Sequence, residues 1–231
     1  RRQRQMCIRD RGYAALEKNT TGNYNTAVGA AALDANTTSN NNTAVGYNAL
    51  TANTAGNNTG IGYKALEANT TGSDNSALGT GCLTANTTGS NNTAVGKDAL
   101  NDNTTGYNNT AVGYAAMDSM TTGGYSTAIG SGALGAYTGS EQTAVGSNAL
   151  GECTTGYDNT AVGVAALKET TTGAHNTAVG DDALKNNTTG NSNTALGKQA
   201  LVTVTTSSYN TAIGKDALYA CTTGSANTAV G

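Results

Sequence analysis

The sequence predicts an all-β fold, a parallel β-solenoid or β-roll of about twelve 17-residue coils with two short strands in each coil. Three observations predict it. A block of the form Asn-Thr-Ala-Val-Gly recurs at fixed spacing, glycine occupies one phase of every repeat, and the chain contains no proline, tryptophan or phenylalanine. A unit of this length is too short to bury a core alone, so neighbouring units must stack on one another.

The recurring block defines a repeat with the consensus N-T-A-V-G-x-x-A-L-x-A-N-T-T-G-x-N, whose positions are numbered 1 to 17 below. Successive blocks are 17 residues apart, except for two steps of 16 residues. The blocks begin at Asn25, Asn42, Asn58, Asn75, Asn92, Asn109, Ser126, Gln142, Asn159, Asn176, Asn193, Asn210 and Asn227.

Glycine and aliphatic phases predict the corners and the core. Position 5 is always glycine, which predicts a corner where a side chain is excluded: Gly29, Gly46, Gly62, Gly79, Gly96 and their later equivalents. Positions 4 and 9 are aliphatic and are expected to form a thin core that includes Val28, Val45, Ile61, Leu33, Leu50 and Leu66. Strands are therefore expected at positions 1–4 and 8–13, with turns at positions 5–7 and 14–17.

Position 12 predicts a buried ladder of asparagine side chains. Asparagine alternates there with cysteine, valine and methionine, and this exchange indicates a mostly buried site. Stacked asparagines can satisfy backbone groups and one another. The ladder is expected to include Asn36, Asn53, Asn69, Asn86 and Asn103.

The N-terminal segment does not follow the repeat. Residues 1–11 hold all five arginines of the chain, and we interpret them as a non-repeat leader that is artefactual or disordered. Residues 12–231 are expected to form a single repeat array, truncated at both ends. Without the five arginines and Asp10, seven lysines stand against fourteen acidic residues, a net charge of about −7. Such a surface argues against nucleic acid as a partner.

The strand at positions 1–5 hardly varies on either of its faces. A sheet with one face in water would leave alternate residues free to vary. We therefore expect this sheet to pack against the same sheet of other chains, which predicts a homo-oligomer. A trimer is the predicted oligomer. A monomer and an open filament remain as alternatives.

The run N-T-A-V-G-x-x-A-L, repeated through Gly231, resembles the head repeats of trimeric autotransporter adhesins (YadA-like) and related arrays in phage tail fibres. The resemblance covers residues 12–231. It implies left-handed parallel β-rolls, three chains associated through one sheet, and binding of host matrix or cell surfaces. The adhesin unit typically has 14 residues with Ser-Val-Ala-Ile-Gly at its centre, and no binding residue of that family matches a position here.

No enzyme, cofactor or metal site is expected. The only histidine, His175, lies at a variable turn position, and no second histidine or recurrent carboxylate could complete a catalytic triad or a metal site. Cys82 and Cys153 occupy core phases and are interpreted as buried free thiols. No apolar stretch is long enough to span a membrane.

These features predict a structural segment of an extracellular fibre or adhesin at a cell surface or in a virion tail fibre. Two alternatives are an ice-binding solenoid with threonine ladders and a self-assembling extracellular filament. A host-surface glycan or matrix protein is a candidate ligand. Variable turn positions carry the candidate surface-binding tyrosines Tyr47, Tyr63, Tyr107, Tyr114 and Tyr157. Asn-Asn-Thr triplets leave glycosylation open at Asn41, Asn57, Asn91 and Asn108.

Overall fold

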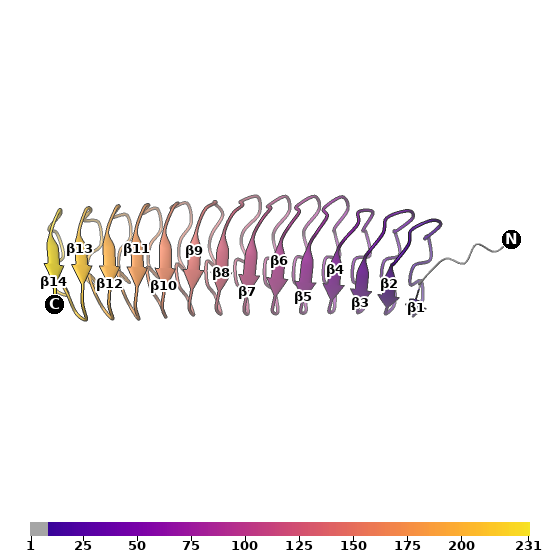
Figure 1. Cartoon of the computed structure of the whole chain (residues 1–231), viewed down its shortest axis with the longest axis horizontal. Helices are drawn as coiled ribbons and strands as arrows, with labels where there is room; N and C mark the ends of the chain where they lie inside the picture. Colours follow the sequence, from indigo (N-terminus) through magenta and orange to yellow (C-terminus); the bar gives the residue numbers. More distant parts are fainter. Residues whose placement is uncertain (1–8) are drawn as a thin grey trace. The chain divides into compact units, whose positions relative to one another are not determined.

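The computed structural model describes residues 9–231 and contains strands, turns and no helix in that range. The chain divides into two compact units, which meet in sequence between Asn109 and Thr110. Each unit is a parallel β-solenoid in which every coil contributes one three-residue strand (Figure 1). The prediction of an all-β solenoid is confirmed, with one repeat per coil.

The strands pair in chain order within each unit. The first unit contains β1 (Arg9–Arg11), β2 (Thr26–Val28), β3 (Thr43–Val45), β4 (Thr59–Ile61), β5 (Ser76–Leu78) and β6 (Thr93–Val95). The second contains β7 (Thr110–Val112), β8 (Thr127–Ile129), β9 (Thr143–Val145), β10 (Thr160–Val162), β11 (Thr177–Val179), β12 (Thr194–Leu196), β13 (Thr211–Ile213) and β14 (Thr228–Val230).

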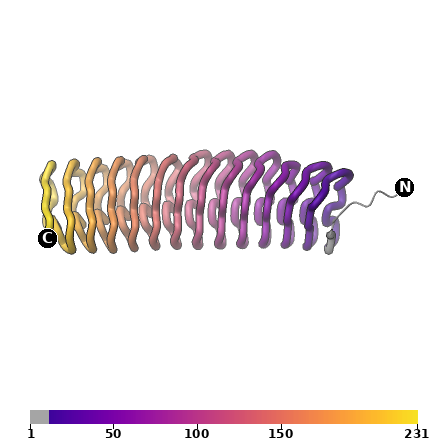
Figure 2. Tube along the Cα trace, viewed as in Figure 1, coloured from indigo at the N-terminus to yellow at the C-terminus, as the bar shows by residue number. Residues whose placement is uncertain are grey.

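Like residues align from coil to coil. Val28 pairs with Val45, and Val45 pairs with Ile61, although the second step is one residue shorter than the first. The missing residue is therefore absorbed in a turn, and the strand register is kept. Figure 2 shows the coils of each unit following the same path one after another.

Of the non-repeat leader predicted at residues 1–11, the structure describes only the last three residues. Residues 1–8 lie outside the described part of the chain, but Arg9–Arg11 form strand β1 and pair in register with Thr26–Val28. The first coil therefore begins before Gly12.

The predicted second strand of each coil is wrong. Positions 6–11 are turns throughout the described repeats. Position 9 has a positive φ, for example 54° at Leu33, which is incompatible with an extended strand. Two local hydrogen bonds close the turns, from the amide of Ala32 to the carbonyl of Gly29 and from the amide of Asn36 to the carbonyl of Leu33. Between these two turns, the amide of Leu33 donates a hydrogen bond to the carbonyl of Ala49 on the next coil at 3.1 Å. The equivalent bonds of other coils are 3.0–3.1 Å long.

The core lies between the strand and this turn segment. Alanine at positions 3 and 8 and leucine at position 9 are fully buried in most coils, including Leu33, Leu50 and Leu66. By contrast, Val28, Val45 and Ile61 were expected in the core and are only half-buried. Side chains alternate between the faces of a strand, so when the alanine at position 3 points inward, positions 2 and 4 must point outward.

Candidate interaction surfaces

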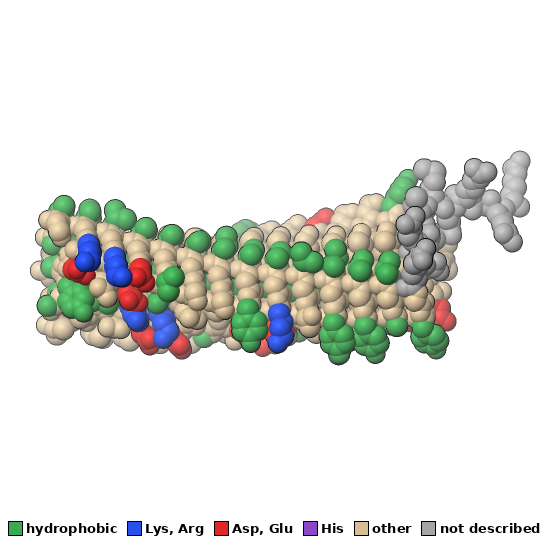
Figure 3. All heavy atoms as spheres, turned by 90° about the horizontal axis from the view of Figure 1, so that it is seen from below, with side chains coloured by type: hydrophobic (Ala, Val, Ile, Leu, Met, Phe, Trp, Pro, Cys, Tyr) green, Lys and Arg blue, Asp and Glu red, His purple; other side chains and the backbone are tan. Residues whose placement is uncertain are grey.

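The outer face of the strands carries two columns of side chains in each unit. One column is threonine at position 2, with Ser76 as the exception, and the other is valine, isoleucine or leucine at position 4. Most of these side chains are half-buried, and several large ones are exposed, such as Leu78 at 50% and Leu196 at 46%. Figure 3 shows hydrophobic side chains recurring from coil to coil in each unit. From β2 to β14 no strand contains a charged residue, so this surface is neutral and amphipathic.

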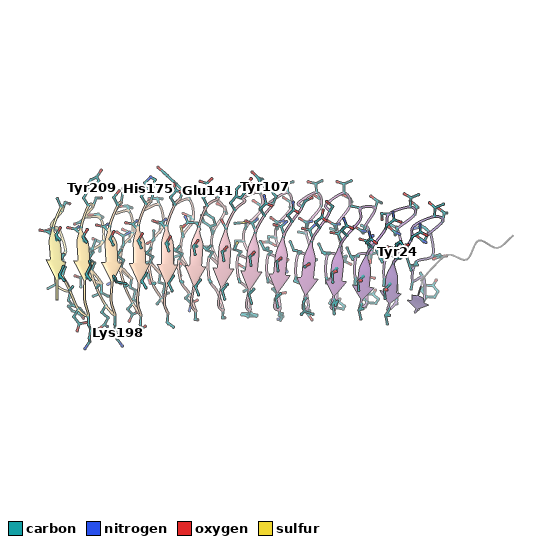
Figure 4. All side chains as sticks on the ribbon, viewed as in Figure 1. Tyr24, Tyr107, Glu141, His175, Lys198 and Tyr209 are labelled. Atoms are coloured by element: carbon teal, nitrogen blue, oxygen red, sulfur yellow. The ribbon has the colours of Figure 1, made fainter. Side chains whose placement is uncertain are left out.

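Charged side chains gather instead on the turns. In the second unit, Lys198 Nζ lies 3.1 Å from Asp181 Oδ2 of the preceding coil, and both side chains are about half exposed. This hydrogen bond raises the pKa of Lys198. Figure 4 shows Lys198 at one turn edge and His175 and Tyr209 at the opposite edge. An open hollow of about 450 Å³ near the first of these edges is lined by Gln199, Asp216 and Tyr219.

Two of the five candidate tyrosines stack on each other in the first unit. Tyr47 and Tyr63 lie on consecutive coils with ring centroids 5.7 Å apart and ring planes 13° from parallel. Lys64 Nζ lies 5.7 Å from the centre of the Tyr63 ring and 3.1 Å from Glu67 Oε2. Tyr47 and Tyr63 therefore form an exposed aromatic pair beside a polar network.

The other three candidate tyrosines are also exposed. Tyr157 packs edge-on against His175 with ring centroids 4.9 Å apart, and His175 Nδ1 lies 3.5 Å from Asp158 Oδ2. Tyr107 lies on the position-16 turn of the first unit and Tyr114 on the position-6 turn of the second.

The asparagine ladder of position 12 is continuous over part of the first unit. Asn69 Nδ2 donates to Asn53 Oδ1 at 2.6 Å, and Asn86 Nδ2 donates to Asn69 Oδ1 at 2.7 Å. Asn103 Nδ2 then donates to Asn86 Oδ1 at 2.8 Å, while Asn36 Nδ2 donates to Asn19 Oδ1 at 2.9 Å. The five asparagines expected in the ladder, Asn36, Asn53, Asn69, Asn86 and Asn103, are all fully buried.

A second polar column at position 1 was not anticipated. Asn58 Oδ1 accepts the backbone amide of Asn75 at 3.0 Å, and Asn58 Nδ2 donates to the carbonyl of Gly72 at 2.8 Å. The same two bonds recur in most coils, and the side chains are buried. The sequence contains a signal for this column, because asparagine begins nearly every block. The repeat pattern predicts position 1 as part of the strand and therefore misses the column.

The four turn asparagines at which glycosylation was left open are all exposed. Asn41, Asn57, Asn91 and Asn108 lie at position 17 with φ between 55° and 63°. Asn41 Nδ2 donates to Asn57 Oδ1 at 3.2 Å, so part of this column is hydrogen-bonded across coils.

The buried thiols are shielded from water. Burial raises the pKa of the Cys82 thiol from 9.0 to about 12 and that of Cys153 to about 11. Burial also raises the pKa of Tyr137, whose hydroxyl donates to the carbonyl of Ser140. Within residues 9–231 no group of three His, Cys, Asp or Glu side chains is placed to hold a metal ion.

Comparison with known proteins identifies no family whose model matches the chain and no curated protein that is similar to it. The described part of the chain contains no helix long and apolar enough to cross a lipid bilayer.

Proposed function

We propose that this chain is a structural repeat segment of an extracellular fibre or adhesin, at a cell surface or in a virion tail fibre. In this proposal three copies associate through the outer face of the Asn-Thr-Ala-Val-Gly strands, with the left-handed coils of the adhesin heads that the sequence resembles. The chain then acts as a rigid element for surface attachment and not as an enzyme.

The observation that carries the proposal is the outer face of the strands. Within a single chain, packing of the core does not explain the aliphatic residue at position 4, because that side chain points away from the core. Yet the position is valine, isoleucine or leucine in all thirteen copies from Val28 to Val230. Recurrent exposed aliphatic side chains on one face are typical of a protein–protein interface. The exchange of valine, isoleucine and leucine at this position is compatible with a packed interface.

The regular coil spacing of this face within each unit fits self-association. A second copy has the same coil spacing and the same neutral face, so each coil can meet an equivalent coil. A partner with another spacing would lose this match after a few coils.

The decisive experiment measures molecular mass in solution by sedimentation equilibrium. We expect three times the chain mass for the natural sequence. Val145→Lys places a charge on the outer face of β9 without touching the core and is expected to yield monomers, because burying an unpaired charge is costly. Ser147→Lys, two residues further on the turn, is the matched control and is expected to stay trimeric. A monomeric natural chain, or a trimeric Val145→Lys variant, contradicts the proposal.

Electron microscopy of the same material separates a discrete trimer from the filament alternative. An open polymer would give fibres of variable length, and the sedimenting mass would grow with concentration. Particles of uniform length at every concentration support the trimer.

The ice-binding alternative is favoured by one observation, the regular threonine column at position 2. Thr143, Thr177 and Thr194 are exposed in the single chain, and neighbouring strands carry no charge. The adjoining aliphatic column is irregular, however, since Leu78 and Leu196 project further than valine. We expect no thermal hysteresis from the natural protein, and a clear hysteresis that is lost in Thr177→Lys would favour ice binding instead.

A further inference from the structure

The position-6 turn edge of the first unit carries tyrosines with one gap between them. Tyr13, Ala30, Tyr47 and Tyr63 occupy this position on four consecutive coils. The amide of each following position 7 donates to the position-6 carbonyl of the coil before it, at 2.8, 3.0 and 2.9 Å for the three steps. The four residues therefore form one column, and alanine replaces the second tyrosine.

The exposure of the three rings follows from this gap. Tyr47 and Tyr63 stack on each other and are 52% and 49% exposed, whereas Tyr13 is 88% exposed. The small side chain of Ala30 leaves the Tyr13 ring without an aromatic neighbour on the next coil. Large hydrophobic side chains project from this edge in Figure 3.

The gap has the width of one ring. Coils repeat at about 4.8 Å, so the side chains of Tyr13 and Tyr47 start about 9.6 Å apart, twice the strand spacing. A ring inserted between them would lie one coil from each tyrosine, as Tyr47 and Tyr63 do with ring centroids 5.7 Å apart, which is within the range of offset stacking but looser than close contact between flat rings. A pyranose chair, which is thicker than a flat aromatic ring, fills this space better.

We propose that Tyr13, Ala30 and Tyr47 form a saccharide-binding slot, in which one pyranose ring stacks between the two tyrosines. The slot lies on a turn edge and not on the outer face of the strands. It goes beyond the proposed function, and its test can succeed or fail whether or not three chains associate.

The test uses saturation-transfer NMR on the full chain with cellotetraose, chitotetraose and maltotetraose, and with phenol as a flat aromatic probe. We expect at least one tetrasaccharide to bind in the millimolar range and more tightly than phenol. Tyr13→Ala removes one wall and is expected to weaken that binding at least tenfold.

The sharper variant is Ala30→Tyr, which fills the gap with a third stacked ring. It adds aromatic surface, yet binding is expected to be lost because the slot is closed. Thr80→Tyr adds a tyrosine on the other side of Tyr63 and leaves the slot open, so it is the matched control and should bind as the natural chain does. Circular dichroism and sedimentation of each variant separate loss of the slot from loss of the fold or of the oligomer.

Retained binding in Ala30→Tyr or Tyr13→Ala overturns the proposal. So does a natural chain that binds none of the tetrasaccharides, and so does a chain for which phenol binds more tightly than the tetrasaccharides.

Discussion

At the scale of single residues, the corner glycine of position 5 is the least replaceable part of the repeat. Gly146 has a φ of 136°, and a Cβ added to it would lie 2.3 Å from the carbonyl oxygen of Gly163 on the next coil. We expect Gly146→Ala to lower the free energy of unfolding by at least about 3 kcal/mol, because neither the backbone angle nor the coil spacing can accommodate a methyl group. Urea denaturation followed by circular dichroism measures this change.

Gly151→Ala is the matched control in the same coil. Gly151 lacks a positive φ, and the nearest atom to an added Cβ is 3.3 Å away. The free energy of unfolding should change by no more than about 1 kcal/mol. Equal effects of the two substitutions would show that the close approach of coils at position 5 is not the cause.

The buried thiol of Cys82 makes a prediction about pH. Its pKa is raised from 9.0 to about 12 in the folded chain, so above pH 9 the unfolded state releases a proton that the folded state keeps. The stability contributed by the neutral buried thiol is full below pH 9 and is lost as the pH rises towards 12. Position 8 is alanine in every other complete coil, so Cys82→Ala restores the consensus.

We expect the stability of the natural chain to fall relative to Cys82→Ala by about 1.4 kcal/mol per pH unit above pH 9. Urea titrations at pH 7, 8, 9, 10 and 10.5 measure the difference, which should be constant up to pH 9. Parallel curves over the whole range would mean that the thiol ionises equally in both states.

At the scale of the element, the repeat period predicted the stacking of coils but not the path of each coil. The recurring block predicted which strand residues align from coil to coil. It did not predict the turn after the corner glycine, because Leu33 and its equivalents combine a core side chain with a left-handed backbone that leucine seldom adopts. Burial of the leucine side chain, worth about 2 kcal/mol, offsets a backbone cost of similar size.

A signal for this turn was present at position 7. Asn48, Asp98 and Gly81 occupy it, and these residue types tolerate a positive φ better than others do. The half-exposed place of Val28 could have been deduced in the same way, since Ala27 and Val28 must face opposite sides of one strand. The turn at position 7 and the outward orientation of Val28 describe the single chain only. The partner of the outer face lies outside that chain, so it does not follow from them.

The asparagine ladder is a property of the element, because each side chain depends on its neighbours. Asn86 donates to Asn69 and to the carbonyl of Gly89 and accepts a bond from Asn103. We expect Asn86→Val to cost about 2–4 kcal/mol, because it leaves buried polar groups unpaired on both neighbouring coils. Hydrogen exchange of the amides in the flanking coils should increase most.

Asn187→Val is the matched control, because Asn187 has no asparagine at position 12 of either neighbouring coil and so belongs to no ladder. Its neighbours at position 12 are Thr170 and Val204, its Oδ1 has no partner, and its Nδ2 donates only to the carbonyl of Gly190. The loss should therefore be smaller, about 1 kcal/mol. If both substitutions cost the same, the asparagines stabilise their own turns and not a cooperative column.

At the scale of the whole molecule, stability should be close to a sum over coils and their interfaces, since each coil contacts only its neighbours. Removing one complete repeat, residues 75–91, joins Asp74 at position 17 to Asn92 at position 1 and keeps every phase. We expect this shortened chain to fold with the same circular dichroism per residue. The dependence of its unfolding free energy on urea should fall by roughly a thirteenth, in proportion to the surface buried.

Removing only residues 75–83 is the contrasting deletion, because it joins position 17 of one coil to position 10 of the next. The strand β5, its corner glycine and Leu83 are lost, and the remaining half-coil can neither pair with its neighbours nor fill the core. We expect this shorter deletion to destabilise the first unit far more than the longer one does. A chain that tolerates the nine-residue deletion as well as the 17-residue deletion would show that the phase of the repeat does not determine how the coils stack.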